Sequence, residues 1–146
     1  MILDKNLLVS NNQAITSSAA STDVIDIGVA RDIGIGDPLE LIAVITASLD
    51  AVGSATLVTA LEGSVDNSNW TVMAQTRAIG KADLLAGREL CRFKLPATGA
   101  GQAHPRYYRL NYTVATGPMT AGTVTAGLNL DRQANHAYPP GIVVNN

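Results

Sequence analysis

The chain is 146 residues long, with 15% charged residues, a formal net charge of -2 and a single cysteine. This length suits one domain with its own buried core. Nucleic acid is excluded as a partner, because its binding needs a basic patch and the ten Lys and Arg residues are scattered. The one thiol, Cys91, excludes an internal disulfide and any metal site built from several thiolates.

The low charge also bears on the surface. An ordinary soluble domain has roughly 25% charged residues, so here Thr, Ser, Asn, Gly and Ala must cover much of the exterior. Such a surface has little electrostatic repulsion, and we expect a partner to cover part of it. The apolar run at 7–9 is too short for a signal peptide, and no later run is long enough to span a membrane. We therefore expect synthesis in the cytoplasm and no membrane partner.

The first part of the chain is small and polar, without the stripe of an amphipathic helix. Residues 1–21 predict an extended N-terminal arm, strand-like at 7–9 and again at 14–16. Residues 23–28, DVIDIG, alternate and predict a short strand. Two glycines, two aspartates and a proline then predict a loop at 31–38.

The middle of the chain alternates strands and turns. Residues 39–48, LELIAVITAS, are apolar on both faces and predict a central strand covered on both sides. After a turn, residues 55–62 predict a strand with one buried face. The turn cluster at 63–69 precedes a strand at 70–76, in which we predict that alternate residues from Trp70 point inward.

The later part of the chain contains the strongest strand signal. Residues 79–87 fit either one helical turn or a short edge strand, and 89–95 predict a strand in which Cys91 is buried and inert. In residues 106–130, apolar and polar residues alternate on both sides of a break at 115–118. We predict a long hairpin here.

Together these elements predict the fold class. About eight short strands, frequent turn signals and almost no helix are typical of an all-β, single-domain jelly roll or β-sandwich. We place the sandwich at 22–133, between the N-terminal arm at 1–21 and an extended C-terminal tail at 134–146. The Pro139-Pro140-Gly141 run makes that tail non-helical.

No motif predicts catalysis, a cofactor or a metal. His104 and His136 lie in separate Gly- or Pro-flanked loops, without the HxH or HxxxH spacing of a metal site. The aspartates within 23–37 lack the pattern of a calcium loop and are interpreted as turn formers. We predict that the protein is not an enzyme. A hydrolase that uses His104 or His136 is kept as a rival interpretation.

Several stretches carry a resemblance to a known family. They are MILDK at the start, VIDIGVARDIGIGDPLEL at 24–41, RYYRLNYTVATGPMTAGTVTAGLNLDRQ at 106–133, and YPPG near the end. Together they resemble the capsid cement (decoration) proteins of tailed phages, of the Bordetella-phage type. The resemblance spans nearly the full length and is weaker at 51–101.

The resemblance implies a jelly-roll protein on the outer face of an icosahedral head, where it clamps neighbouring major capsid subunits. It also implies a homo-oligomer, as a dimer or alternatively a trimer, without catalysis, cofactor or small-molecule substrate. The protein would be made in the bacterial host cytoplasm and reside in the virion. Many weak contacts of this kind sum to tight binding through effective concentration.

We predict contacts to the capsid or to a second copy in the two arms and in the loop at 31–38. The predicted contact residues are Ile2, Leu3, Asp4, Lys5, Leu7, Leu8, Arg31, Asp32, Tyr138, Ile142 and Val143. Removal of residues 1–9 is predicted to leave the sandwich folded and to weaken attachment to the head.

The alternative function is a carbohydrate-binding β-sandwich module of the virion, such as a receptor-binding or head-fibre domain. Such modules present a row of exposed aromatic rings to sugars. The candidates here are Trp70, Tyr107 and Tyr138, and this row cannot be assembled if Trp70 lies in the core.

Overall fold

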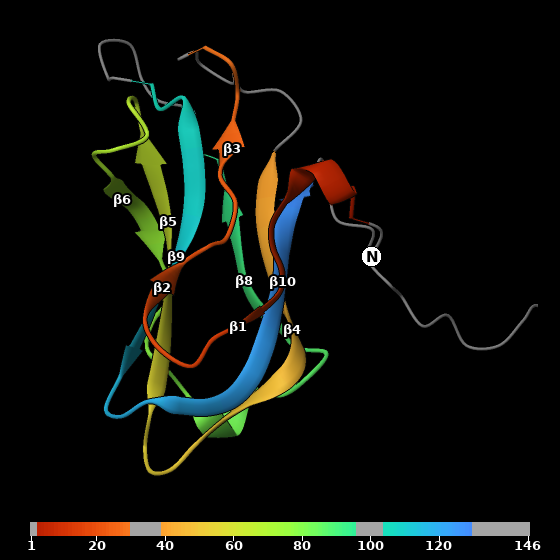
Figure 1. Ribbon diagram of the computed structural model, residues 1–146, viewed down its shortest axis with the longest axis vertical. Helices are drawn as coiled ribbons and strands as arrows, with labels where there is room; N and C mark the ends of the chain where they lie inside the picture. Colours follow the sequence, from red (N-terminus) through yellow and green to blue (C-terminus); the bar gives the residue numbers. More distant parts are fainter. Residues whose placement is uncertain (1–2, 30–38, 96–103, 130–146) are drawn as a thin grey trace, which may run out of the picture.

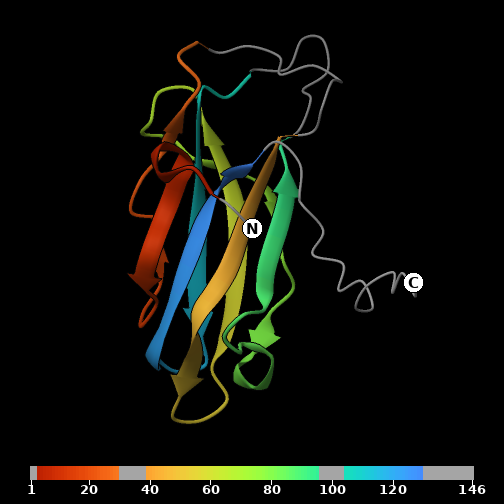
Figure 2. The same cartoon turned by 90° about the vertical axis from the view of Figure 1, so that its right-hand side faces the viewer.

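A computed structural model gives the structure of the chain and describes residues 3–29, 39–95 and 104–129. Two antiparallel sheets face each other and enclose one core, as Figure 1 and Figure 2 show from two sides. The predicted all-β sandwich is therefore confirmed. In the described part of the chain, no helix has the length and apolar character needed to cross a membrane.

Among the described residues, one sheet has four strands and the other has six. The four-stranded sheet has the order β1 (Leu8–Ala14), β10 (Met119–Asn129), β4 (Glu40–Ala51) and β8 (Glu89–Lys94). The six-stranded sheet has the order β2 (Ala19–Ala20), β9 (Tyr107–Ala115), β5 (Thr56–Ser64) and β6 (Thr71–Gln75), with β3 (Ile25–Asp26) on β9 and β7 (Ile79–Gly80) on β5. The described stretches also contain the short 3-10 helices η1 (Lys5–Leu7) and η2 (Lys81–Asp83).

The two strand orders match at their first three positions. The first three strands of the four-stranded sheet are next in the chain to the strands at the same positions of the six-stranded sheet: β1 to β2, β10 to β9 and β4 to β5. The fourth, β8, follows β7, which like β6 pairs with β5. This strand order is that of a jelly roll, in which the chain passes repeatedly between two sheets.

The predicted hairpin at 106–130 is wrong in its pairing. β9 and β10 are both strands with the predicted inward faces, and Tyr108, Leu110 and Val124 are buried. However, β9 pairs with β5 and β10 pairs with β4, so the two lie in different sheets. Thr116 and Gly117, both at positive φ, turn the chain from one sheet to the other.

The predicted arm is also part of the sandwich beyond residue 7. β1 pairs with β10, and the side chains of Val9 and Ile15 are fully buried in the core. The main-chain N–H of Asp23 donates to the carbonyl of Val9 at 2.9 Å. The expectation that the sandwich stays folded without residues 1–9 therefore no longer follows, because this deletion removes a core side chain.

The predicted central strand is confirmed for its first half. β4 lies between β10 and β8, and Leu41, Ile42 and Ala43 are fully buried. From Thr46 to Ser48 the strand is exposed. At 79–87 both predicted alternatives occur in part, because β7 is followed directly by η2.

The prediction for residues 70–76 is wrong at Trp70 and Val72. The register of β6 on β5 shifts by one residue between the pairs Leu61–Ala74 and Glu62–Val72, which marks a β-bulge. The bulge leaves Ala74 against the core and turns Val72 outward, with 51% of its surface exposed. Trp70 lies on the outer face as well, where the guanidinium carbon of Arg109 is 4.0 Å from its ring centroid.

Candidate interaction site

The structure describes five of the predicted contact residues, and all of them lie at the start of the chain. These are Leu3, Asp4, Lys5, Leu7 and Leu8. The other predicted contact residues, Ile2, Arg31, Asp32, Tyr138, Ile142 and Val143, lie outside the described residues, as do His136 and the predicted loop at 31–38.

Asp4 fixes the shape of this N-terminal segment. Its carboxylate accepts a hydrogen bond from the N–H of Asn6 at 2.9 Å, and its carbonyl accepts one from the N–H of Leu7 at 3.0 Å. These bonds cap and close η1, the usual role of an aspartate at a helix start. The turn keeps Lys5 and Leu7 at the surface, with 37% of Leu7 exposed.

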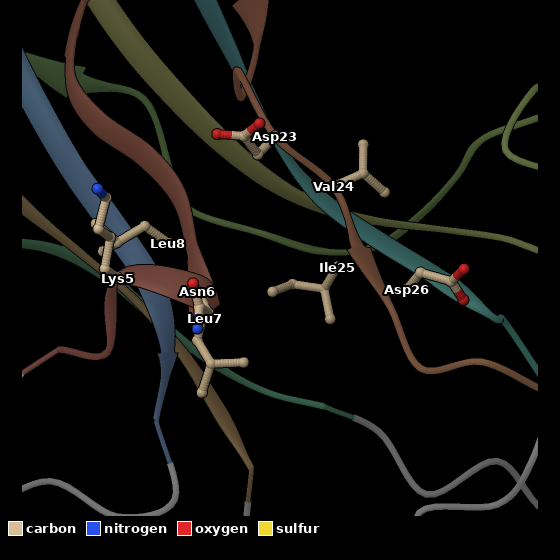
Figure 3. A pocket seen from close by; sticks show the side chains of 8 residues that line it. All are labelled: Lys5, Asn6, Leu7, Leu8, Asp23, Val24, Ile25 and Asp26. Atoms are coloured by element: carbon tan, nitrogen blue, oxygen red, sulfur yellow. The ribbon is translucent and has the colours of Figure 1, made fainter.

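A groove of about 380 Å³ runs between this segment and the stretch at 23–26. Figure 3 shows the residues that line it: Lys5, Asn6, Leu7, Leu8, Asp23, Val24, Ile25 and Asp26. In this view Ile25 points towards Leu7 and Leu8, whereas the carboxylate of Asp26 points away. Since Ile25 is buried and Leu7 is partly exposed, the groove has an apolar floor that is open to solvent.

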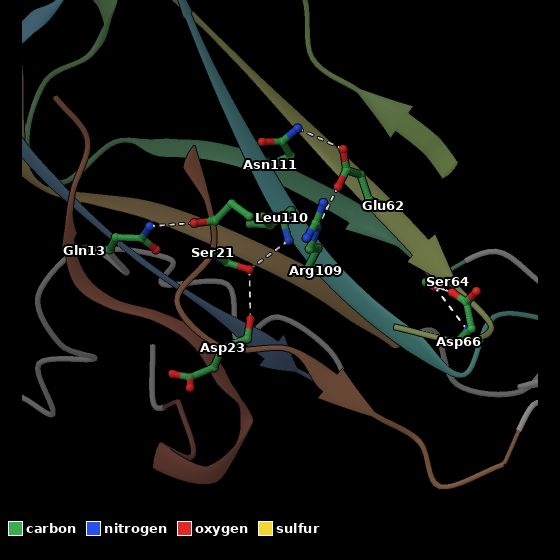
Figure 4. Close-up of polar contacts among 10 residues, drawn as sticks. Gln13, Ser21, Asp23, Glu62, Ser64, Asp66, Arg109, Leu110 and Asn111 are labelled. Carbon is green, nitrogen blue, oxygen red and sulfur yellow. Dashed lines mark hydrogen bonds and ion pairs between the residues drawn. The ribbon is translucent and has the colours of Figure 1, made fainter. Parts of the chain in front are cut away.

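A polar network holds the second wall of the groove in place (Figure 4). Ser21 accepts a hydrogen bond from the N–H of Leu110 at 3.2 Å and donates one to the carbonyl of Asp23 at 2.9 Å. The side chain of Gln13 donates to the carbonyl of Ala20 at 2.8 Å and accepts from the N–H of Thr22 at 3.0 Å. The 20–23 segment is thereby tied to both β1 and β9.

Asp26 anchors the far end of that wall. Both of its carboxylate oxygens accept hydrogen bonds from Arg106, at 2.7 Å each, and one also accepts from the N–H of Gly28 at 2.8 Å. The side-chain hydrogen bond from Arg106 is the main reason why the pKa of Asp26 is lowered, with a further contribution from the N–H of Gly28. The carboxylate is therefore charged at neutral pH, and both of its oxygens are engaged by Arg106.

The groove has the chemistry of a peptide-binding surface. Lys5 on one wall and Asp23 on the other have exposed charges, and neither forms an ion pair within the described part of the chain. Between them lie Leu8 and Ile25, with Val24 at the rim. An extended segment with an apolar residue between polar or charged neighbours matches this arrangement.

Lys5, Leu7 and Leu8, which line one wall of the groove, are among the predicted contact residues, whereas no residue of the other wall was predicted as a contact. The first wall belongs to the N-terminal arm, where apolar and charged residues occur together within the first nine positions. Asp23, Val24 and Ile25 read only as a short strand with turn-forming aspartates, because the groove exists only once that strand lies beside η1. No local sequence pattern predicts that residues 5–8 and 23–26 lie side by side.

A second polar cluster lies on the outer face of the six-stranded sheet. The carboxylate of Glu62, whose side chain is 8% exposed, accepts from Nε of Arg109 at 2.7 Å and from Nδ2 of Asn111 at 2.9 Å (Figure 4). Arg109 in turn stacks on Trp70. The charges of Glu62 and Arg109 are thus paired, and the ring of Trp70 packs against the guanidinium group.

The structure also shows the surroundings of Cys91 and His104. Burial raises the pKa of the Cys91 thiol to about 12, so the thiol stays protonated and unreactive at neutral pH. In the stretches that the structure describes, no three or more His, Cys, Asp or Glu side chains are grouped so as to hold a metal ion. His104 is partly exposed at the start of the last described stretch.

Comparison with models of protein families gives a match to this chain. The model of a family described as Bbp16 matches residues 9–128, which begin within β1, end within β10 and cover nearly all of the sandwich. A search of curated proteins finds no match. The name of the matching family points to a protein of a Bordetella phage.

Proposed function

The chain belongs to the Bbp16 family, and from this membership we propose that it is a structural cement protein of a phage head. In this proposal it binds the outer face of the capsid and clamps neighbouring major capsid subunits. It acts as a homo-oligomer, without catalysis, cofactor or nucleic acid. The match across nearly all of the sandwich carries the proposal.

The surface chemistry supports this role. A jelly roll with few charges offers rigid, weakly polar faces that pack closely against other proteins. The groove beside η1 presents Lys5 and Asp23 around an apolar floor, and it suits a segment of a capsid subunit. When many copies bind one shell, such modest contacts together give tight overall binding.

Attachment to heads tests the proposal and the groove together. Heads assembled without this chain are mixed with the purified protein and sedimented, and the bound protein is quantified. We expect wild-type protein to saturate the heads and Lys5→Glu and Leu7→Asp to bind about tenfold more weakly each, because they alter the wall and rim of a contact.

A matched control is Val52→Asp. Val52 is 84% exposed and lies in the turn after β4, at the other end of the sandwich from η1 (Figure 1). It is expected to bind like the wild type. Wild-type protein that fails to bind heads would contradict the cement proposal, and equal binding by all variants would remove the groove from it.

A carbohydrate-binding module is the second candidate, and one observation favours it. Trp70 and Tyr107 lie on the outer face of the six-stranded sheet, beside Arg109 and Arg106. Because Trp70 is the single tryptophan of the chain, saturable quenching of its fluorescence by a glycan is the direct readout. Absence of quenching across a panel of bacterial surface glycans would remove this candidate.

A further inference from the structure

The edges of the two sheets differ in how they are protected. An edge strand presents unpaired main-chain groups that can pair with a strand of another protein, and most proteins block such edges. In the described part of this fold, the edge strands are β1 and β8 in one sheet. In the other they are β2 with β3 beside β9, and β6 with the two-residue β7 beside β5.

Two of these edges are covered or interrupted. Along β1, the N–H of Asp23 donates a hydrogen bond to the carbonyl of Val9, and the side chain of Gln13 forms hydrogen bonds with the 20–23 segment. The opposite sheet has only two-residue strands at that side, β2 and β3, so it offers no continuous ladder.

The β8 edge is protected by charge. Glu89, Arg92 and Lys94 alternate along it with buried residues, and Arg92 forms ion pairs with Glu89 at 3.2 Å and Glu40 at 3.8 Å. Charged side chains along an edge strand disfavour pairing with another chain.

The β6 edge has no such charge. Residues 70–76, WTVMAQT, include no charged side chain, and β5 is the one strand that pairs with β6 in the described residues. Figure 1 shows β6 at the outer margin of the sandwich. The exposed side chain of Val72 projects from this strand.

The neighbouring residues resemble the centre of a protein–protein contact. Trp and Arg are enriched among residues that contribute most to binding. Here Trp70 directly precedes β6 and stacks against Arg109, which Glu62 holds in turn. Because this cluster is already ordered, a partner that covers it loses little side-chain entropy.

We propose that β6 accepts an extended strand from a major capsid subunit, which adds to the six-stranded sheet and packs against Val72 and Trp70. This inference rests on the proposed cement function and names a second attachment surface, separate from the groove at η1. The chemistry of the occupant follows from the edge: an uncharged strand rich in β-branched residues, paired through main-chain hydrogen bonds.

The β-bulge favours a capsid strand over a second copy of this chain. Met73 is the extra residue of the bulge and lies at the middle of β6. Two copies related by a two-fold axis would each bring a bulged strand to the ladder, which leaves the ladder irregular in both strands. A strand of different sequence carries no such constraint.

Two variants block the edge in different ways. Val72→Lys places a charge on the exposed position, which is how natural edge strands avoid pairing. Gln75→Pro removes one main-chain N–H that points away from β5 and could donate to an added strand. Since the N–H of Thr76 points to the carbonyl of Thr59 at 2.9 Å, alternation along the strand directs the N–H of Gln75 away from β5. The proline therefore spares the internal ladder.

The matched control is Leu85→Lys, because Leu85 is 49% exposed and Val72 is 51% exposed. All variants are first checked by circular dichroism and thermal unfolding, and then assayed for binding to heads and for self-association by sedimentation velocity. We expect Val72→Lys and Gln75→Pro to bind heads about tenfold more weakly or worse, and Leu85→Lys to bind within about twofold of the wild type.

The outcomes separate this inference from the function on which it rests. If wild-type protein binds heads and the folded β6 variants bind equally well, the β6 inference is overturned and the cement function stands. If the β6 variants lose self-association and keep head binding, the occupant is a second copy and the proposed capsid strand is wrong. If wild-type protein does not bind heads, the cement function itself fails.

Discussion

At the scale of single residues, Asp66 shows how one side chain builds a turn. Its carboxylate accepts hydrogen bonds from the N–H groups of Ser68 at 2.9 Å and Asn69 at 2.8 Å, and from the side chains of Asn69 and Ser64. These bonds, the N–H of Asn69 first, lower the pKa of Asp66 far below its ordinary value of 3.8. The sequence predicted a turn here from residue types, and the structure supplies the reason.

The lowered pKa makes a prediction about stability and pH. Because the folded state holds the Asp66 carboxylate at a lower pKa than the unfolded state, its stabilising effect is complete above about pH 4 and is lost as the pH falls below 3.8. We expect the free energy of unfolding of Asp66→Asn, measured in urea, to lie below that of the wild type at pH 7. The difference is expected to shrink steadily towards pH 2, and a difference that stays constant would contradict this account.

Trp70 marks the limit of prediction at this scale. A strict alternation along 70–76 places Trp70 inward, and this is what a buried aromatic residue usually does. One extra residue at Met73 changes the phase of the strand, and Arg109 supplies an outer partner for the ring. Neither the bulge nor the partner leaves a signal in the local sequence.

At the scale of elements, β10 depends on a glycine at a bend. Gly122 has φ of +119°, and a Cβ there would lie 2.5 Å from Cα of Leu49 on the neighbouring strand β4. Its carbonyl accepts the N–H of Ile15 at 3.1 Å, so the bend also receives the chain just after β1. Close approach of three segments explains why no side chain fits.

Gly117 offers a matched comparison for this position. It has φ of +116°, and a Cβ there would lie 3.9 Å from its nearest neighbour, the carbonyl oxygen of Val52. We expect Gly117→Ala to lower the free energy of unfolding by about 1–2 kcal/mol, from backbone strain alone. Gly122→Ala adds a steric clash and is expected to cost about 3 kcal/mol or more.

Chemical denaturation of the two variants measures this difference directly. If the two substitutions lower the free energy of unfolding by the same amount, the close approach at Leu49 is not a determinant of stability. Backbone conformation alone then explains both effects. The comparison thus isolates the contact between β10 and β4 from the conformational preference of glycine.

The pairing of elements was less predictable than their existence. Period-two alternation identified β5, β8, β9 and β10, because each of these strands has one face against the core, and a run that is apolar on both faces identified β4. It misassigned β9 and β10 as a hairpin, because a short turn joins them and alternation records only which side is buried. The choice of neighbour depends on strands far away in the chain.

At the scale of the whole molecule, the jelly roll explains how the candidate surfaces are distributed. Passing between sheets brings β1 beside β3 at one side and leaves β6 at another, so the groove and the β6 edge lie on separate parts of the sandwich (Figure 1). A rigid body with two separate contact surfaces is suited to bridging neighbouring subunits of a shell.

The fold class was predictable from the sequence, and the location of these surfaces was only partly so. Composition and alternation indicate an associative β-sandwich, and Lys5 and Leu7, which the sequence predicts as contact residues, line a groove in the structure. The β6 edge was not foreseen, since its significance lies in the contrast with edges that other segments cover.

The copy number of the chain in purified phage heads tests the central claim most directly. Quantitative mass spectrometry of density-purified heads gives the ratio of this chain to the major capsid protein. The cement function predicts a fixed ratio near one to one, or a simple symmetric fraction of it, because a brace occupies equivalent positions over the whole shell. A few copies per particle, or none, would contradict it.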